Sequence, residues 1–77
     1  MTKKWDYEGL YAFMDHLKEQ GYELQIRREE LERCIMEWLG SFHPDYANKF
    51  KRALLAAGLI RPVNPAERRP RLYQIIR

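Results

Sequence analysis

Cysteine is nearly absent from this chain, since Cys34 stands alone among 77 residues. A single thiol cannot form an intrachain disulfide, and it cannot supply the cysteine ligands of a structural zinc site. Proteins without disulfides are typical of reducing compartments, so we expect a cytoplasmic protein. Cys34 falls on the apolar stripe of a helix predicted below, where a thiol packs as a small apolar side chain.

Long apolar runs are missing as well. No stretch approaches the roughly 18 consecutive apolar residues that a membrane-spanning helix needs. The first six residues, Met1 to Asp6, lack the apolar segment of a signal peptide. We therefore expect no contact with a membrane.

Groups that carry catalysis or bind metal are few. The chain has no glycine-rich phosphate loop, and its sequence suggests no pair of a nucleophile and a base. His16 and His43 are far apart, and neither has a cysteine or a second histidine at the spacing of metal ligands. We expect a surface or capping role for both histidines, and we expect no enzyme activity, no metal and no cofactor.

The chain contains enough apolar residues to form one small hydrophobic core. Apolar residues make up 45% of the sequence, and 13% of the residues are aromatic. A chain of this size buries only about 60% of the surface that its unfolded form exposes, so it has room for a single domain. Its charge is uneven, because residues 1–40 carry a net charge of −3 and residues 41–77 carry +6. This asymmetry indicates a basic face for a polyanion, although many small proteins distribute solvated charges unevenly.

Three segments have the apolar period of a helix with one buried face. We predict helices over about residues 5–20, 28–39 and 44–57, each followed by a glycine that can end a helix. The residues of the three stripes are Leu10, Phe13, Met14 and Leu17, then Leu31, Cys34, Ile35, Trp38 and Leu39, then Ala47, Phe50, Leu54 and Ala57.

Three shorter segments have the character of half-buried strands. We predict strands over about residues 22–26, 59–63 and 71–76. The apolar side of the first strand is formed by Tyr22, Leu24 and Ile26. The second and third strands are joined by residues 64–70, which are rich in proline and arginine, so they form a hairpin with a basic tip.

The order of helix, strand, two helices and hairpin resembles the winged-helix variant of the helix-turn-helix family. The resemblance is carried by RREELERCIMEWLGSFHPDYANKFKRALLAAGLIRP, in which RALLAAGLI is similar to the end of a recognition helix and its entry into the wing. It covers nearly the whole chain and departs from the family at Arg27, where such domains often place a capping serine or threonine. The resemblance implies an α+β fold, a single domain over residues 1–77 with three helices, a short strand and a C-terminal β-hairpin wing.

Winged-helix domains typically place their third helix in the major groove of double-stranded DNA and their hairpin on the backbone or minor groove. The resemblance therefore implies a small DNA-binding transcriptional regulator. Its candidate DNA-binding residues in this chain are Tyr46, Asn48, Lys49, Lys51, Arg52, Arg68, Arg69 and Arg71.

The expected orientation of these residues follows from helical geometry. With Phe50 at the centre of the buried face, a turn of about 100° per residue places Asn48, Arg52 and Leu55 on the opposite side. Lys49 and Lys51 are then on the flanks, and Tyr46 is nearer the core. Asparagine can pair with adenine and arginine with guanine, whereas lysines mostly add attraction to phosphates.

Two other functions agree with the same sequence. Winged helices also serve as protein-interaction modules in replication and transcription assemblies, and an exposed Leu55 and Met36 would favour that role. Recognition of structured RNA is equally compatible, because phosphate contacts are alike on both polymers. The aromatic residues of the first helix are suited either to covering the small core or to forming a homodimer contact, and they are Trp5, Tyr7 and Tyr11.

Overall fold

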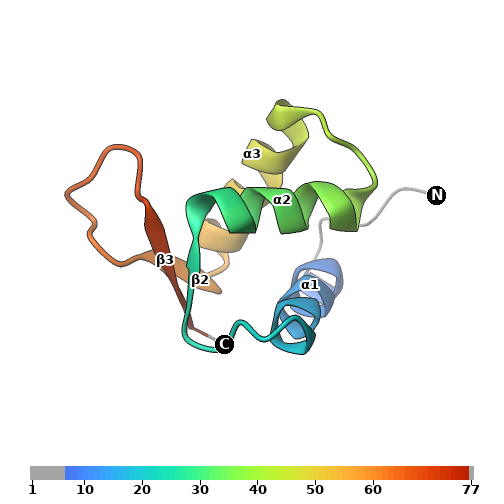
Figure 1. Cartoon of the computed structure of the whole chain (residues 1–77), viewed down its shortest axis with the longest axis horizontal. Coiled ribbons are helices and arrows are strands. Elements are labelled where there is room, and N and C mark those ends of the chain that lie inside the picture. Colours follow the sequence, from blue (N-terminus) through green and yellow to red (C-terminus); the bar gives the residue numbers. More distant parts are fainter. Residues whose placement is uncertain (1–6, 77) are drawn as a thin grey trace.

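The computed structural model describes residues 7–76 and all of their side chains except that of Tyr7. Within these residues the chain forms three helices, α1 (Tyr7–Glu19), α2 (Arg28–Leu39) and α3 (Pro44–Ala56), and three strands, β1 (Gln25–Arg27), β2 (Ile60–Pro62) and β3 (Leu72–Ile75) (Figure 1). This order of elements confirms the predicted α+β fold of a small winged helix. None of the helices in the described part of the chain is long and apolar enough to cross a bilayer.

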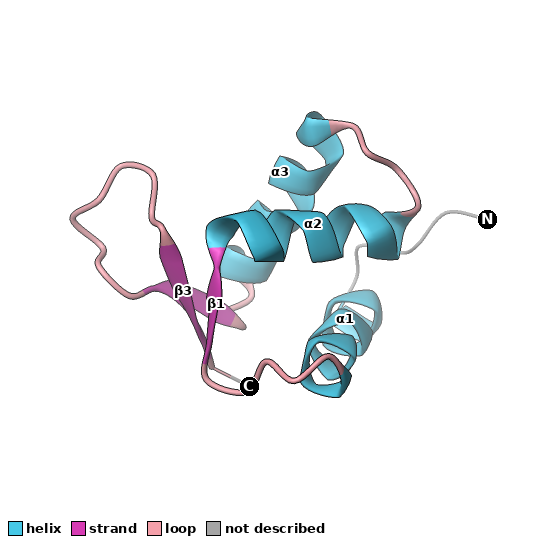
Figure 2. Cartoon of the chain, in the orientation of Figure 1, coloured by secondary structure: helices cyan, strands magenta, loops and turns pink. Residues whose placement is uncertain are grey.

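The central strand of the sheet is β3, which pairs with β1 on one side and β2 on the other, both in antiparallel direction. Tyr73 of β3 lies opposite Ile26 of β1 and Pro62 of β2. The last two strands thus form the predicted hairpin, and the strand between α1 and α2 adds to it. Figure 2 shows the loop between β2 and β3, residues 63–71, extending away from the helices as the wing of the fold.

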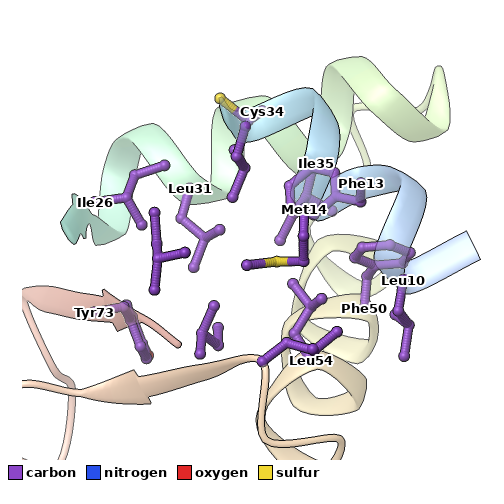
Figure 3. Packing of buried hydrophobic residues seen from close by; sticks show 14 of the residues in the cluster. Leu10, Phe13, Met14, Ile26, Leu31, Cys34, Ile35, Phe50, Leu54 and Tyr73 are labelled. Carbon is purple, nitrogen blue, oxygen red and sulfur yellow. The ribbon is translucent and has the colours of Figure 1, made fainter. Parts of the chain in front are cut away.

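The core is formed by the apolar stripes that were predicted on the three helices. Figure 3 shows Met14 of α1, Ile35 of α2 and Leu54 of α3 lying together, and all three side chains are fully buried. Phe13 of α1 packs edge to face on Phe50 of α3, with 5.2 Å between the ring centroids. Such aromatic pairs contribute about 0.5–1.5 kcal/mol beyond the area that they bury.

Local sequence explains how the helices begin and end. Gly40 ends α2 with a φ of 69°, a left-handed conformation that residues with a Cβ rarely adopt. Pro44 opens α3, where its missing N–H leaves no hydrogen bond unmade. The Nδ1 atom of His43 accepts a hydrogen bond from the backbone N–H of Asp45 at 3.3 Å, which confirms the predicted capping role of this histidine.

The strands are shorter than the predicted segments. β1 begins at Gln25, so the prediction of a strand from residue 22 is wrong, and Leu24, expected on the buried side, is 76% exposed. The cause is the tight end of α1, where the N–H of Tyr22 still donates to the carbonyl of Leu17 at 3.0 Å. A backbone held in this turn cannot at the same time be extended. β2 and β3 likewise cover only the inner parts of their predicted segments.

Candidate nucleic-acid interface

A groove of about 430 Å³ lies between α3 and the wing, and we call it the α3–wing groove. The two helices α2 and α3 contribute Arg28, Glu32, Asn48, Lys51, Arg52 and Leu55 to its lining. The hairpin contributes Pro62, Glu67, Arg68, Arg69, Pro70 and Tyr73.

The groove brings together candidate residues that are far apart in the sequence. Five of the eight line it, namely Asn48, Lys51, Arg52, Arg68 and Arg69. The other three are exposed outside the lining, and they are Tyr46, Lys49 and Arg71. The basic residues of the third helix and of the wing tip therefore share one surface.

The helical geometry predicted that Lys51 projects freely from the flank of α3. The structure shows that it does not. Its ammonium group lies 2.9 Å from Oε2 of Glu32 on α2, and only 13% of its side chain is exposed. The same Nζ atom is 5.9 Å from the centre of the Tyr73 ring. Because α2 packs against this flank of α3, the lysine is held in an ion pair at the groove instead of reaching into solvent.

Tyr46 does not lie near the core as predicted, whereas Leu55 lines the groove with Asn48 and Arg52 on its predicted side of α3. Tyr46 is 48% exposed, whereas Leu55 is half-buried against the core. The cause is the path of the chain after α3, where the N–H of Leu59 donates to the carbonyl of Leu54 at 3.0 Å and leads directly into β2. The hairpin and α2 cover the flank that carries Leu55, and the opposite flank with Tyr46 and Lys49 stays open.

The wing is tied to the start of α2 by Arg28, which the sequence analysis missed. Its Nη1 atom donates a hydrogen bond to the carbonyl of Arg69 at 3.2 Å, and its backbone N–H donates to the carbonyl of Arg71 at 2.9 Å. Arg27, the preceding residue, forms no side-chain hydrogen bond to the helix start.

Local hydrogen bonds and two prolines also restrain the tip of the wing. The side-chain oxygen of Asn64 accepts a hydrogen bond from the N–H of Ala66 at 3.2 Å, and its carbonyl accepts one from Glu67 at 3.2 Å. Pro65 and Pro70 restrict the backbone on either side of Glu67. The guanidinium groups that follow Glu67 therefore extend from a loop that loses little conformational entropy when a ligand binds.

Positive charge predominates in the α3–wing groove. Glu32 is paired with Lys51, so this pair contributes little net charge. Glu67 is the other carboxylate in the lining, and it is outnumbered by the four arginines, Arg28, Arg52, Arg68 and Arg69. Planar guanidinium groups bind phosphate oxygens in a bidentate manner, so the groove is suited to a phosphate-bearing ligand.

The described residues outside the groove show neither a metal site nor a reactive thiol. In residues 7–76 no group of three or more histidine, cysteine or acidic side chains could hold a metal ion. Burial raises the pKa of the Cys34 thiol, although the charge of Arg33 lowers it in part. A thiol that stays protonated is a poor nucleophile, and Cys34 packs in the core as predicted.

Aromatic side chains of the described residues are exposed at three places outside the groove lining, and one of them is Tyr46 of α3. Tyr11 is exposed on α1, while Trp5 and the side chain of Tyr7, which belong to the same dimer hypothesis, lie outside the described residues. Phe42, in the turn between α2 and α3, is 73% exposed. These positions are the described aromatic surfaces that a protein partner could contact.

Comparison of the chain with models of protein families, with curated proteins and with solved structures finds no match to any of them. The function of the α3–wing groove must therefore be inferred from its own residues and geometry.

Proposed function

We propose that the protein binds double-stranded DNA through the α3–wing groove and acts as a small transcriptional regulator of the winged-helix type. The observation that carries the proposal is the convergence of Asn48 and Arg52 of α3 with Arg68 and Arg69 of the wing on one groove. No catalytic step is assigned to any of these residues.

The proposed binding mode places α3 in the major groove. The amide of Asn48 and the guanidinium of Arg52 are then available to base edges, where they pair best with adenine and guanine. Arg68 and Arg69 would contact phosphates or enter a narrow minor groove, which attracts arginine through its negative potential. One strand of the DNA backbone would pass along the α3–wing groove, with guanidinium groups on both sides of it.

Lys51 has a smaller role in this proposal than the sequence suggested, because Glu32 already neutralises it. Lys49 and Arg71 are exposed beside the groove and would add to the attraction of phosphates. Four or five phosphate contacts would give a slope of about −4 when the logarithm of the binding constant is plotted against the logarithm of salt concentration.

The test is a titration with a random-sequence duplex at several salt concentrations. The double variant Arg68→Ala, Arg69→Ala should weaken binding and make the salt slope shallower by about 2, because two phosphate contacts are lost. The matched control, Lys18→Ala with Arg33→Ala, removes the same charge from exposed positions on α1 and α2 and should leave the slope nearly unchanged. An unchanged slope in the wing variant would contradict the role given to the wing.

The second candidate function is a protein-interaction module within a replication or transcription assembly. The exposed aromatic rings of Phe42 and Tyr11 favour it, and Tyr11 also favours a homodimer through α1. Absence of duplex binding even at low salt would support this module. Sedimentation of the protein alone tests the homodimer, and a hairpin RNA in the same titration tests the preference for DNA.

A further inference from the structure

Asp45 is a carboxylate on the helix that the proposed function places in the DNA. It lies in the first turn of α3, and its side chain is 77% exposed. An exposed negative charge at this position repels phosphates and therefore lowers the affinity for any DNA sequence.

Asp45 shares a stripe of α3 with the two residues proposed to meet base edges. The spacing of Asp45, Asn48 and Arg52 is i, i+3 and i+7, which places the three side chains along one face of a helix. All three are exposed, and this face is opposite the buried residues Ala47 and Phe50. The carboxylate therefore points where Arg52 and Asn48 point.

The neighbourhood of Asp45 leaves its carboxylate available to a ligand. Among the described residues, the ionisable group that lies near this carboxylate is the imidazole of His43, whose Nδ1 atom is 3.8 Å from Oδ2 of Asp45. That same nitrogen accepts a hydrogen bond from the backbone N–H of Asp45 at 3.3 Å, so it is already engaged in capping the helix.

Asp45 has a structural role of moderate size at this position. An acidic side chain in a first turn stabilises a helix through the helix dipole by about 0.3–1 kcal/mol. His43 and Pro44 already start α3, by capping it and by fixing its first φ. In the proposed complex the same carboxylate would face a polyanion, and a hydrogen bond accepted from a donor on the DNA would offset that repulsion.

We propose that Asp45 accepts a hydrogen bond from the N4 amino group of a cytosine in the major groove and thereby selects for that base. The inference rests on the proposed duplex binding by α3. Cytosine presents an amino donor in the major groove, and aspartate accepts from it. Residues at the start of a recognition helix are those that contact base edges, which is the position of Asp45.

The test is selection of bound sequences from a pool of randomised duplexes by the full chain. The wild-type protein should enrich cytosine at one position of its site, and Asp45→Ala should reduce that enrichment by about tenfold while binding random duplexes as tightly as wild type or more tightly. Asp45→Asn should move the preference at the same position toward adenine, because an amide can pair bidentately with that base.

The matched control is Glu8→Gln, which removes an exposed carboxylate from the first turn of α1, outside the groove lining. It should keep the wild-type preference, which separates base selection from general effects of charge and helix stability. A cytosine preference that survives Asp45→Ala would overturn the inference and leave duplex binding intact, as would wild-type binding without any base preference. Absence of duplex binding by the wild type would instead overturn the proposed function, and this inference with it.

Discussion

Single residues determine which charges the α3–wing groove offers to a ligand. The ion pair of Lys51 and Glu32 removes one cation that the sequence appeared to provide. Arg28 adds another cation, and it was not expected because its position depends on the pairing of β1 with β3. The groove lining therefore presents more guanidinium groups than free ammonium groups to a ligand.

Glu32 neutralises Lys51 beside the groove, so its replacement should change both stability and DNA affinity. Glu32→Gln leaves the ammonium group of Lys51 half-buried without its carboxylate, so the free energy of unfolding should fall by about 1–3 kcal/mol. The same change removes a negative charge from the groove and should raise the affinity for a random duplex about three- to tenfold at low salt. Urea denaturation and the duplex titration measure the two effects.

Glu37→Gln is the control for this change, because it removes an exposed carboxylate from α2 outside the groove lining. It should change neither stability nor affinity by a comparable amount. Weaker duplex binding by Glu32→Gln, in a protein that is still folded, would show that the groove does not bind the DNA backbone.

At the scale of the elements, the wing depends on its attachment to α2. A long loop on a short hairpin would otherwise lose conformational entropy when it binds a ligand. The side chain of Arg28 holds the carbonyl of Arg69, and its backbone N–H holds that of Arg71. The wing is thus positioned before any ligand arrives.

Removal of the Arg28 side chain tests this attachment. Arg28→Ala should speed the hydrogen exchange of the Val63 and Glu67 amides about three- to tenfold, because one hydrogen bond that holds the wing is lost. Arg33→Ala, which removes the same charge from another part of α2, should leave these amides unchanged. Equal exchange in wild type and Arg28→Ala would mean that Arg28 does not hold the wing.

The elements also show which features the sequence could predict. The positions of the helices could be predicted from the local sequence. Apolar stripes such as Leu10 to Leu17 indicate a buried helix face, and a glycine such as Gly40 indicates where a helix ends. The start of β1 and the exposure of Leu24 could not be predicted from local signals, because both depend on how α1 ends. The exposure of Lys51 and Tyr46 was predicted wrongly for a related reason, since the flank of α3 that α2 and the hairpin cover is set by tertiary packing.

The described part of the molecule combines a single core with the basic α3–wing groove. Its extents are 37 × 23 × 20 Å. The net charge of +6 in residues 41–77 belongs to the segment that contains both α3 and the wing. The central claim is that these two elements bind the same duplex.

The most direct test is to follow the backbone amide signals of the full chain by nuclear magnetic resonance while a short duplex is added at low salt. The amides of residues 45–55 and those of residues 67–69 and 71 should shift together and give one dissociation constant, with smaller shifts on α1. Shifts confined to α1, or two groups of shifts with different dissociation constants, would contradict binding by a shared groove.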